Sequence, residues 1–138
     1  MLEGWIEMGL EPNQIHVIES DLSTVGLLLN RGLQAVDNPL KLPSDLDPSI
    51  IIFAVKPQSM DEVAPSFACY SSLNTTFLSI AAGKTMGYFE NILGSNASIV
   101  RSMPNTPAAI RRGITVATRN SCVSEPQKEC CNNLLKAV

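Results

Sequence analysis

The stretch Ile-Val-Arg-Ser-Met-Pro-Asn-Thr-Pro-Ala, residues 99–108, decides the fold because an apolar strand here runs into a loop of small, rigid and amide-bearing residues. Ala54–Gln58 follows the apolar run Ile50–Val55 in the same way, and Ser79–Gly83 closes the run that begins at Thr76. Continuous apolar runs are typical of parallel strands that are covered on both faces. We therefore expect three strand ends to form one crevice at the carboxyl edge of an open sheet.

The length and composition fit a single compact domain. The chain has 138 residues, 45% hydrophobic and 17% charged, and its apolar runs are much shorter than the roughly 18 residues that cross a bilayer. Glu3 and Glu7 precede the first basic residue, Arg31, which differs from the charge pattern of a secretory or mitochondrial leader. We expect a cytoplasmic protein without a membrane partner.

Charge and cysteine patterns argue against two further classes of protein. The net charge is −3, and the basic residues cluster only at Arg101, Arg111 and Arg112, so we expect no nucleic-acid partner. The cysteines and the single histidine have neither the spacing of metal ligands nor that of a disulfide framework, so we expect no metal. These residues are Cys69, Cys122, Cys130, Cys131 and His16.

Strands and helices alternate along the chain, which predicts a doubly wound, mostly parallel α/β sheet. Ser124 and Gln127 have capping-box spacing, and the helix that they open carries Cys130, Leu134 and Val138 four residues apart and continues to the chain end. The other expected helices cover residues 1–10, Leu22–Gly32, Ser59–Tyr70, limited or kinked by Pro65, and Lys84–Leu93. The expected strands are Gln14–Glu19, Leu33–Val36, Ile50–Val55, Thr76–Ala81, Ser98–Met103 and the alternating Gly113–Thr118.

Two of the strand ends are suited to binding a ligand through peptide groups. Small Ala54 permits close approach, Pro57 locks the backbone where the strand ends, and the peptide groups around Val55 and Lys56 matter more than the lysine ammonium. Ile80–Ala82 has no bulky side chain at the strand end, so a flat ring could pack there.

Four polar residues are candidate ligand contacts, although each of them could equally have only a structural role. Asn105 is held between two prolines, either as a preorganised ligand contact or as part of a rigid connector. Glu19 ends a strand where an acid often binds ribose hydroxyls, and Ser20 beside it could donate to a 2′-phosphate. Asn38 is either a turn residue or a contact to the adenosine side of a dinucleotide.

The sequence motifs of other kinds of catalytic or binding site are missing. Gly83-Lys84-Thr85 ends like a phosphate-binding loop, but position 78, where that motif needs glycine, is Leu78. No paired carboxylates, nucleophile elbow or Cys/His pair is present. Hydride transfer from nicotinamide needs mainly positioning and exclusion of water, because the cofactor carries the difficult chemistry.

With these motifs in order, the chain resembles the amino-terminal, Rossmann-like dinucleotide-binding domain of pyrroline-5-carboxylate reductase. The matching segments are Ala54–Gln58, Ser79–Gly83 and Arg101–Ala108, and Met1–Trp5 looks like the helix after that family's glycine-rich turn. The resemblance implies NADPH- or NADH-dependent reduction of 1-pyrroline-5-carboxylate to L-proline, the last step of proline biosynthesis, by a homo-oligomeric protein.

The resemblance also assigns cofactor contacts, and no catalytic residue, within this chain. It places Ser20 and Asn38 near the adenosine half. Glu19 differs from the residues common in the family at that position, which leaves the choice between NADH and NADPH open. The remaining contacts are Ala54, Val55, Lys56 and Pro57 at the ribose and pyrophosphate, Ile80, Ala81 and Ala82 nearer the nicotinamide, and Asn105 at the nicotinamide end.

Two parts of the family pattern are missing. The first strand with its glycine-rich turn is absent, and so is the carboxyl-terminal helical domain that forms the dimer and most of the imine site. Residues 1–138 are therefore expected to be a partial NAD(P)-binding domain that is inactive alone. The alternatives are a non-catalytic nucleotide-binding or interaction module, or another reductase that shares this domain, against which the Asn105 motif argues.

The missing strand generates a stability prediction, because it would lie between Gln14–Glu19 and Ile50–Val55. Unpaired buried backbone groups cost about 1–3 kcal/mol each, and a domain is stable by only about 5–15 kcal/mol. We expect an added amino-terminal strand to raise the free energy of unfolding measured in urea. Equal stability with and without that strand would contradict this expectation.

Overall fold

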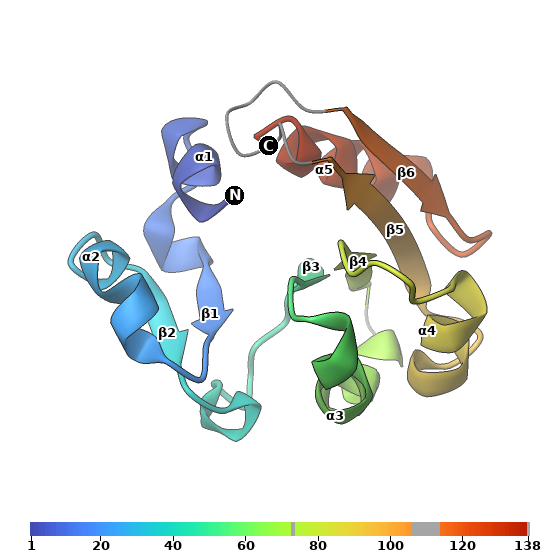
Figure 1. Cartoon of the computed structure of the whole chain (residues 1–138), viewed down its shortest axis with the longest axis horizontal. Helices are drawn as coiled ribbons and strands as arrows, with labels where there is room; N and C mark the ends of the chain where they lie inside the picture. The colour runs from blue at the N-terminus through green and yellow to red at the C-terminus, as the bar shows by residue number, and fades with distance from the viewer. Residues whose placement is uncertain (73, 106–113, 138) are drawn as a thin grey trace. The chain divides into compact units, whose positions relative to one another are not determined.

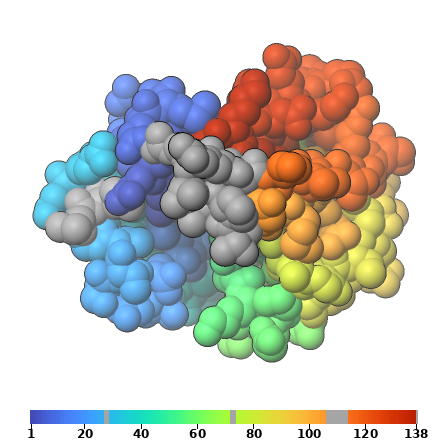
Figure 2. All heavy atoms as spheres, turned by 45° about the horizontal axis from the view of Figure 1, so that its top comes forward, coloured from blue at the N-terminus to red at the C-terminus, as the bar shows by residue number. Residues whose placement is uncertain are grey.

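The computed structural model describes residues 1–72, 74–105 and 114–137 (Figure 1). The chain divides into two compact units, Met1–Leu46 and Asp47–Val138, which Figure 2 shows with all heavy atoms. The strands form a two-stranded sheet in the first unit and a four-stranded sheet of order β3-β4-β5-β6 in the second. Each unit has its own apolar core.

The first unit is a small βαβ arrangement. Its elements are α1 (Leu2–Glu7), β1 (His16–Ile18), a 3-10 turn (Leu22–Val25) that continues into α2 (Gly26–Leu29), and β2 (Gln34–Val36). Strands β1 and β2 are parallel. Asp21 begins the helical segment because its side chain accepts a hydrogen bond from the Ser23 amide at 3.0 Å. Ile15, Val25 and Leu33 form its core cluster of buried side chains, and Trp5 of α1 is buried as well.

The second unit contains the larger sheet. Its strands are β3 (Ile50–Phe53), β4 (Thr76–Ser79), β5 (Ser98–Pro104) and β6 (Thr115–Arg119). The first three pair in parallel, and β6 runs antiparallel to β5. The helices between and after these strands are α3 (Met60–Val63), with 3-10 segments at Pro57–Ser59 and Ala64–Ser72, α4 (Met86–Leu93) and α5 (Glu125–Leu135).

Four phenylalanines form the core on one face of this sheet. Phe53 lies 6.0 Å from Phe77 and 5.8 Å from both Phe67 and Phe89, measured between ring centroids. Phe77 and Phe53 come from strands, Phe67 from the 3-10 segment and Phe89 from α4. These contacts hold α4 and the 3-10 segment against the sheet, since aromatic pairs at this spacing add to simple apolar burial.

Helix α5 covers the opposite face. Its buried residues Cys131 and Leu135 pack with Leu78 and Val100 of the neighbouring central strands. Figure 1 shows α5 on one side of β4 and β5 and α3 and α4 on the other. The expected doubly wound, mostly parallel α/β architecture is therefore confirmed, with helices on both faces of the four-stranded sheet.

Local signals in the sequence predicted several element ends correctly. Ser124 and Gln127 form the complete capping box at the start of α5. Gly94 closes α4 with a φ of +99°, a conformation that favours glycine. Pro65 limits the helix after β3 as expected, because proline cannot continue the hydrogen-bond pattern; the α-helix ends at Val63, and the 3-10 segment Ala64–Ser72 replaces the rest of the expected Ser59–Tyr70 helix.

Three expectations were wrong in detail. The apolar face of α5 is Cys131 and Leu135 rather than Cys130, which is exposed, and the helix ends at Leu135 instead of continuing to the chain end. Strand β6 is exposed on nearly every residue and does not alternate. Gly113 and Val138, which these predictions included, lie outside the described residues.

Strand β3 is also less buried than its sequence suggests. Ile50, Ile51 and Ile52 are only half-buried, whereas all four residues of β4 are buried. Within the described residues β3 pairs with β4 alone and stands at the edge of its sheet, as β1 does in the first unit. An apolar run therefore indicated a strand correctly, but could not show whether both edges are paired.

No helix in residues 1–72, 74–105 and 114–137 is long and apolar enough to cross a membrane.

Candidate functional site

The carboxyl ends of three neighbouring strands meet at one edge of the second unit's sheet. Phe53 pairs with Ser79, and Ser79 pairs with Arg101, so β3, β4 and β5 reach the same level in parallel. Strand β5 continues three residues further, to Pro104. The expected loops after these strands, with Val55, Ala81 and Asn105, therefore lie along the same sheet edge.

The loop after β3 exposes backbone beside small side chains. Ala54 and Lys56 are exposed and Val55 is half-buried. Pro57 is the first residue of a 3-10 turn, for which Lys56 is the preceding cap residue. Proline fixes this turn because its φ is locked and it has no N–H to satisfy. The predicted contact segment is thus held by backbone chemistry and leaves the lysine side chain in solvent.

The loop after β4 is tied to its neighbours at its first residues. The Ile80 amide donates to the Phe53 carbonyl oxygen at 3.2 Å, and the Ala81 amide donates to Ser79 Oγ, also at 3.2 Å. Ala81 is buried, while Ala82 and Gly83 are exposed. Ala82 therefore presents a small, exposed side chain at the sheet edge.

Asn105 has a structural role in addition to its predicted one. Its side-chain oxygen accepts a hydrogen bond from the Ile114 amide at 2.9 Å. The side chain is exposed, so the NH2 group is what Asn105 can present to a ligand. Thr106, Pro107 and the basic pair Arg111 and Arg112 lie outside the described residues.

Ser20 and Asn38 lie in the first unit, at the carboxyl ends of the parallel strands β1 and β2. The Ser20 hydroxyl and the Asp21 amide donate to Glu19 Oε1 at 3.2 Å and 3.1 Å, so the Glu19 carboxylate acts as a local cap. Asn38 Oδ1 accepts a hydrogen bond from the Leu40 amide at 2.9 Å, as expected of a turn residue. A cofactor contact by these two residues stays a prediction.

Sequence reasoning missed a cluster formed by Lys84, Asp61 and Tyr88. Lys84 Nζ lies 2.8 Å from Asp61 Oδ1 and 4.2 Å from the centroid of the Tyr88 ring. The Tyr88 hydroxyl donates to the same Asp61 oxygen. Asp61 precedes Lys84 by 23 residues, so no local spacing could have indicated this contact.

The cluster favours the charged forms of its ion pair. The hydrogen bonds from Lys84 and then from Tyr88 hold the pKa of Asp61 below its usual value. The hydrogen bond to Asp61 raises the pKa of Lys84. Burial, followed by the hydrogen bond to Asp61, raises the pKa of Tyr88. Near neutral pH the pair is therefore fully charged.

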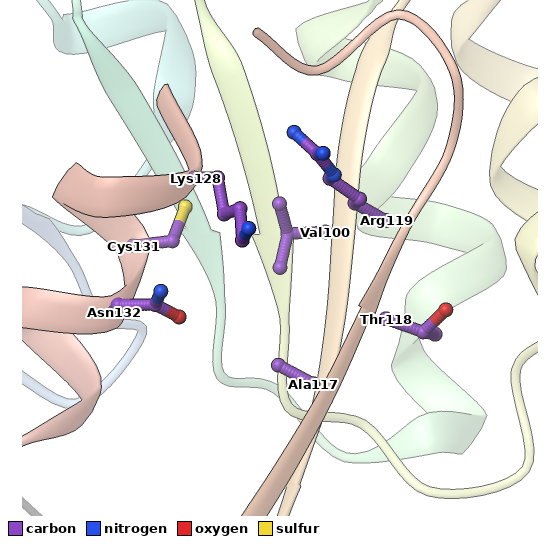
Figure 3. A pocket seen from close by; sticks show the side chains of 7 residues that line it. All are labelled: Val100, Ala117, Thr118, Arg119, Lys128, Cys131 and Asn132. Atoms are coloured by element: carbon purple, nitrogen blue, oxygen red, sulfur yellow. The ribbon is translucent and has the colours of Figure 1, made fainter. Parts of the chain in front are cut away.

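A cavity of about 300 Å³ lies between α5 and the strands β5 and β6 (Figure 3). Arg119 and Lys128 line it, but both contact Glu125, whose pKa is lowered by hydrogen bonds from Arg119 and then from Lys128. The other lining residues are Val100, Ala117, Thr118, Cys131 and Asn132. None belongs to the loops after β3 and β4, so this cavity differs from the predicted crevice.

The described residues contain no group of three or more His, Cys, Asp or Glu side chains that could hold a metal ion.

Comparison with known proteins gives a consistent result. No protein-family profile matches the chain. A curated pyrroline-5-carboxylate reductase of Escherichia coli is 33% identical over 126 residues, which cover 90% of this chain and 46% of the relative. The chain spans about half the length of such curated relatives.

Two solved structures extend this similarity to the fold. A pyrroline-5-carboxylate reductase from Coxiella burnetii matches 99% of this chain and 51% of its own, with a TM-score of 0.89 and 29% identity. The Plasmodium falciparum pyrroline carboxylate reductase with NADP bound matches 76% of this chain and 39% of its own, with a TM-score of 0.65 and 30% identity.

The adjacent thiols of Cys130 and Cys131 should react very differently. Burial raises the pKa of Cys131 to about 11, so near pH 8 roughly one such thiol in a thousand is ionised, and only the thiolate is nucleophilic. We expect iodoacetamide to modify the Cys131→Ser variant at Cys130, and the Cys130→Ser variant to resist modification at Cys131 until it is unfolded. Equal rates in the two folded variants, measured by mass spectrometry, would contradict the buried placement of Cys131.

Proposed function

We propose that this chain, which is homologous to pyrroline-5-carboxylate reductases over most of its length, is the cofactor-binding part of an enzyme of that activity. The whole protein would reduce 1-pyrroline-5-carboxylate to L-proline with NADPH or NADH. One observation carries the proposal: the loops with the family's motifs follow three parallel strands that end at the same sheet edge. Such an edge is where open α/β sheets bind dinucleotides.

The residues at this edge fit a dinucleotide. In this proposal the peptide groups of Ala54–Pro57 hold the ribose and pyrophosphate, and Ile80–Ala82 packs against the nicotinamide. Exposed Ala82 leaves space for a ring, and the Asn105 NH2 group can donate a hydrogen bond. The similar Plasmodium falciparum protein was solved with NADP bound, which supports the cofactor assignment.

These groups indicate what the cofactor and the chain would each contribute to the reaction. When bound, the reduced nicotinamide supplies the hydride. The chain's own residues bind and orient the cofactor through backbone groups and small side chains, and they provide no acid, base or nucleophile in this proposal. Ser20 and Asn38 would contact the adenosine half from the first unit, and Asn38 would do so with its NH2 group, since its oxygen caps a turn.

The imine site and the assembly of subunits are assigned to the rest of the whole protein. This chain spans about half of its relatives. We also propose that the whole protein is a cytoplasmic homo-oligomer and that residues 1–138 alone are inactive. A non-catalytic nucleotide-binding module would instead bind NADPH without turnover in the whole protein.

The test compares two exposed alanines, Ala82 in the loop after β4 and Ala117 on strand β6. Ala82→Leu adds bulk where the nicotinamide would pack, and Ala117→Leu adds the same bulk beside the α5 cavity. In the whole protein we expect Ala82→Leu to raise the Kd for NADPH by about tenfold, equivalent to about 1.4 kcal/mol. Ala117→Leu should leave that Kd unchanged.

The same protein should oxidise NADPH only when 1-pyrroline-5-carboxylate is added, with proline as the product. Binding of NADPH without turnover would favour the non-catalytic module. Absence of binding to both NADPH and NADH, or equal effects of the two alanine variants, would refute the proposed site.

A further inference from the structure

We propose that Lys84, Asp61 and Tyr88 form a clamp that positions the loop after β4 for the cofactor, which makes Lys84 a positioning residue. This inference rests on the proposed function and adds residues that no motif assigned. The clamp is the Lys84–Asp61–Tyr88 cluster, which lies entirely within the second unit. The clamp acts on the backbone of Ala82 and Gly83 and does not touch the cofactor.

The clamp connects the segments that follow two neighbouring strands. Asp61 lies in the first turn of α3, just after the Ala54–Pro57 loop, while Lys84 ends the loop after β4 and Tyr88 lies in α4. In Figure 2 the green atoms around residue 60 and the yellow atoms around residue 85 are neighbours on the surface. One carboxylate oxygen therefore ties α3, the helix that follows the first loop, to the end of the second loop and to α4.

The loop needs such a tie because its own residues supply few contacts. Ala82 and Gly83 are exposed, and Gly83 has a φ of +74°, where the chain reverses without a side chain to pack. The loop is fixed at its start by the Ile80 and Ala81 amide hydrogen bonds. At its end, Thr85 caps α4 by accepting from the Tyr88 amide at 3.1 Å, and Lys84 anchors to Asp61.

The geometry of the lysine distinguishes it from an ordinary surface lysine. The Lys84 side chain is only 17% exposed, although Asp61 is 70% exposed. The ammonium lies over the Tyr88 ring while it donates to Asp61, and a cation beside an aromatic face is attracted to it. Isolated surface ion pairs contribute little, but here three groups order one another, so breaking one contact loosens all of them.

Lys84 could also act by contacting a cofactor phosphate directly, and the two roles predict opposite effects of Asp61. If Asp61 holds Lys84 in the clamp, Asp61→Asn releases the loop and weakens cofactor binding. If Lys84 binds phosphate, Asp61→Asn frees the ammonium and leaves binding unchanged or tighter. The Asp61 variant therefore separates positioning from direct contact.

The experiment measures NADPH affinity, steady-state kinetics and amide hydrogen exchange in the whole protein that contains this chain. We expect Lys84→Met and Asp61→Asn each to raise the Kd and KM for NADPH by about fivefold, the upper range for an exposed pair. The kcat at saturating NADPH should change by less than about twofold, because the loop is restored once the cofactor is bound. The double variant should be no weaker than either single variant, since both remove the same contact.

Without cofactor, amide exchange at Ala82 and Gly83 should accelerate in both variants. Lys84→Arg keeps a cation within reach of Asp61 and should retain most of the affinity. Lys128→Met is the matched control, because it breaks another lysine–carboxylate pair, with Glu125 on α5, at 3.2 Å. This control should leave the affinity and the exchange of the loop unchanged.

Several results would overturn the clamp. Unchanged affinity in Lys84→Met, or weaker binding in Lys84→Met with unchanged or tighter binding in Asp61→Asn, contradicts positioning by the cluster. If Lys128→Met raised the Kd for NADPH as much as Lys84→Met, general loss of positive charge would explain the weaker binding, and the clamp would not be needed. If the unmodified protein binds neither NADPH nor NADH, the proposed function itself fails, and the clamp as a cofactor device fails with it.

Discussion

The parallel register of β3, β4 and β5 is the constraint on which the candidate site depends. Phe53, Ser79 and Arg101 occupy one level across the three strands, so whatever follows each strand emerges at the same edge. The register is specified by burial, because a slip of one residue would move a strand's side chains to the opposite face. Phe77 on one face and Leu78 on the other are both fully buried, and such a slip would exchange them.

This constraint explains why the candidate site consists mainly of backbone and small side chains. Parallel strands deliver turns to the sheet edge, and a dinucleotide can be held there by peptide groups, with the difficult chemistry carried by its nicotinamide. In this site Ala82 matters because its small side chain leaves space, and Pro57 matters because it keeps the turn after β3 rigid. The polar groups that support them, Ser79 Oγ and the Lys84 ammonium, lie behind the loop and anchor it.

The sequence was informative wherever the cause of a structure is local. A capping box, a helix-ending glycine and a proline-limited helix could be recognised because each acts within a few residues, as at Ser124, Gly94 and Pro65. The strand ends could be placed together because parallel topology is a general rule. Contacts between distant residues could not be predicted: the Lys84–Asp61 pair depends on how α3 and α4 pack, and the half-burial of β3 depends on which edge is paired.

Whether adjacent strand ends bind one cofactor is tested by an amide map of the isotope-labelled whole protein titrated with NADPH. We expect the amide signals of residues 54–56 and 80–82 to shift together, with one common dissociation constant. Signals from Ala117, Lys128 and Asn132 around the α5 cavity should stay in place. Shifts centred on that cavity, or different dissociation constants for the two loops, would show that the strand ends do not form one cofactor site.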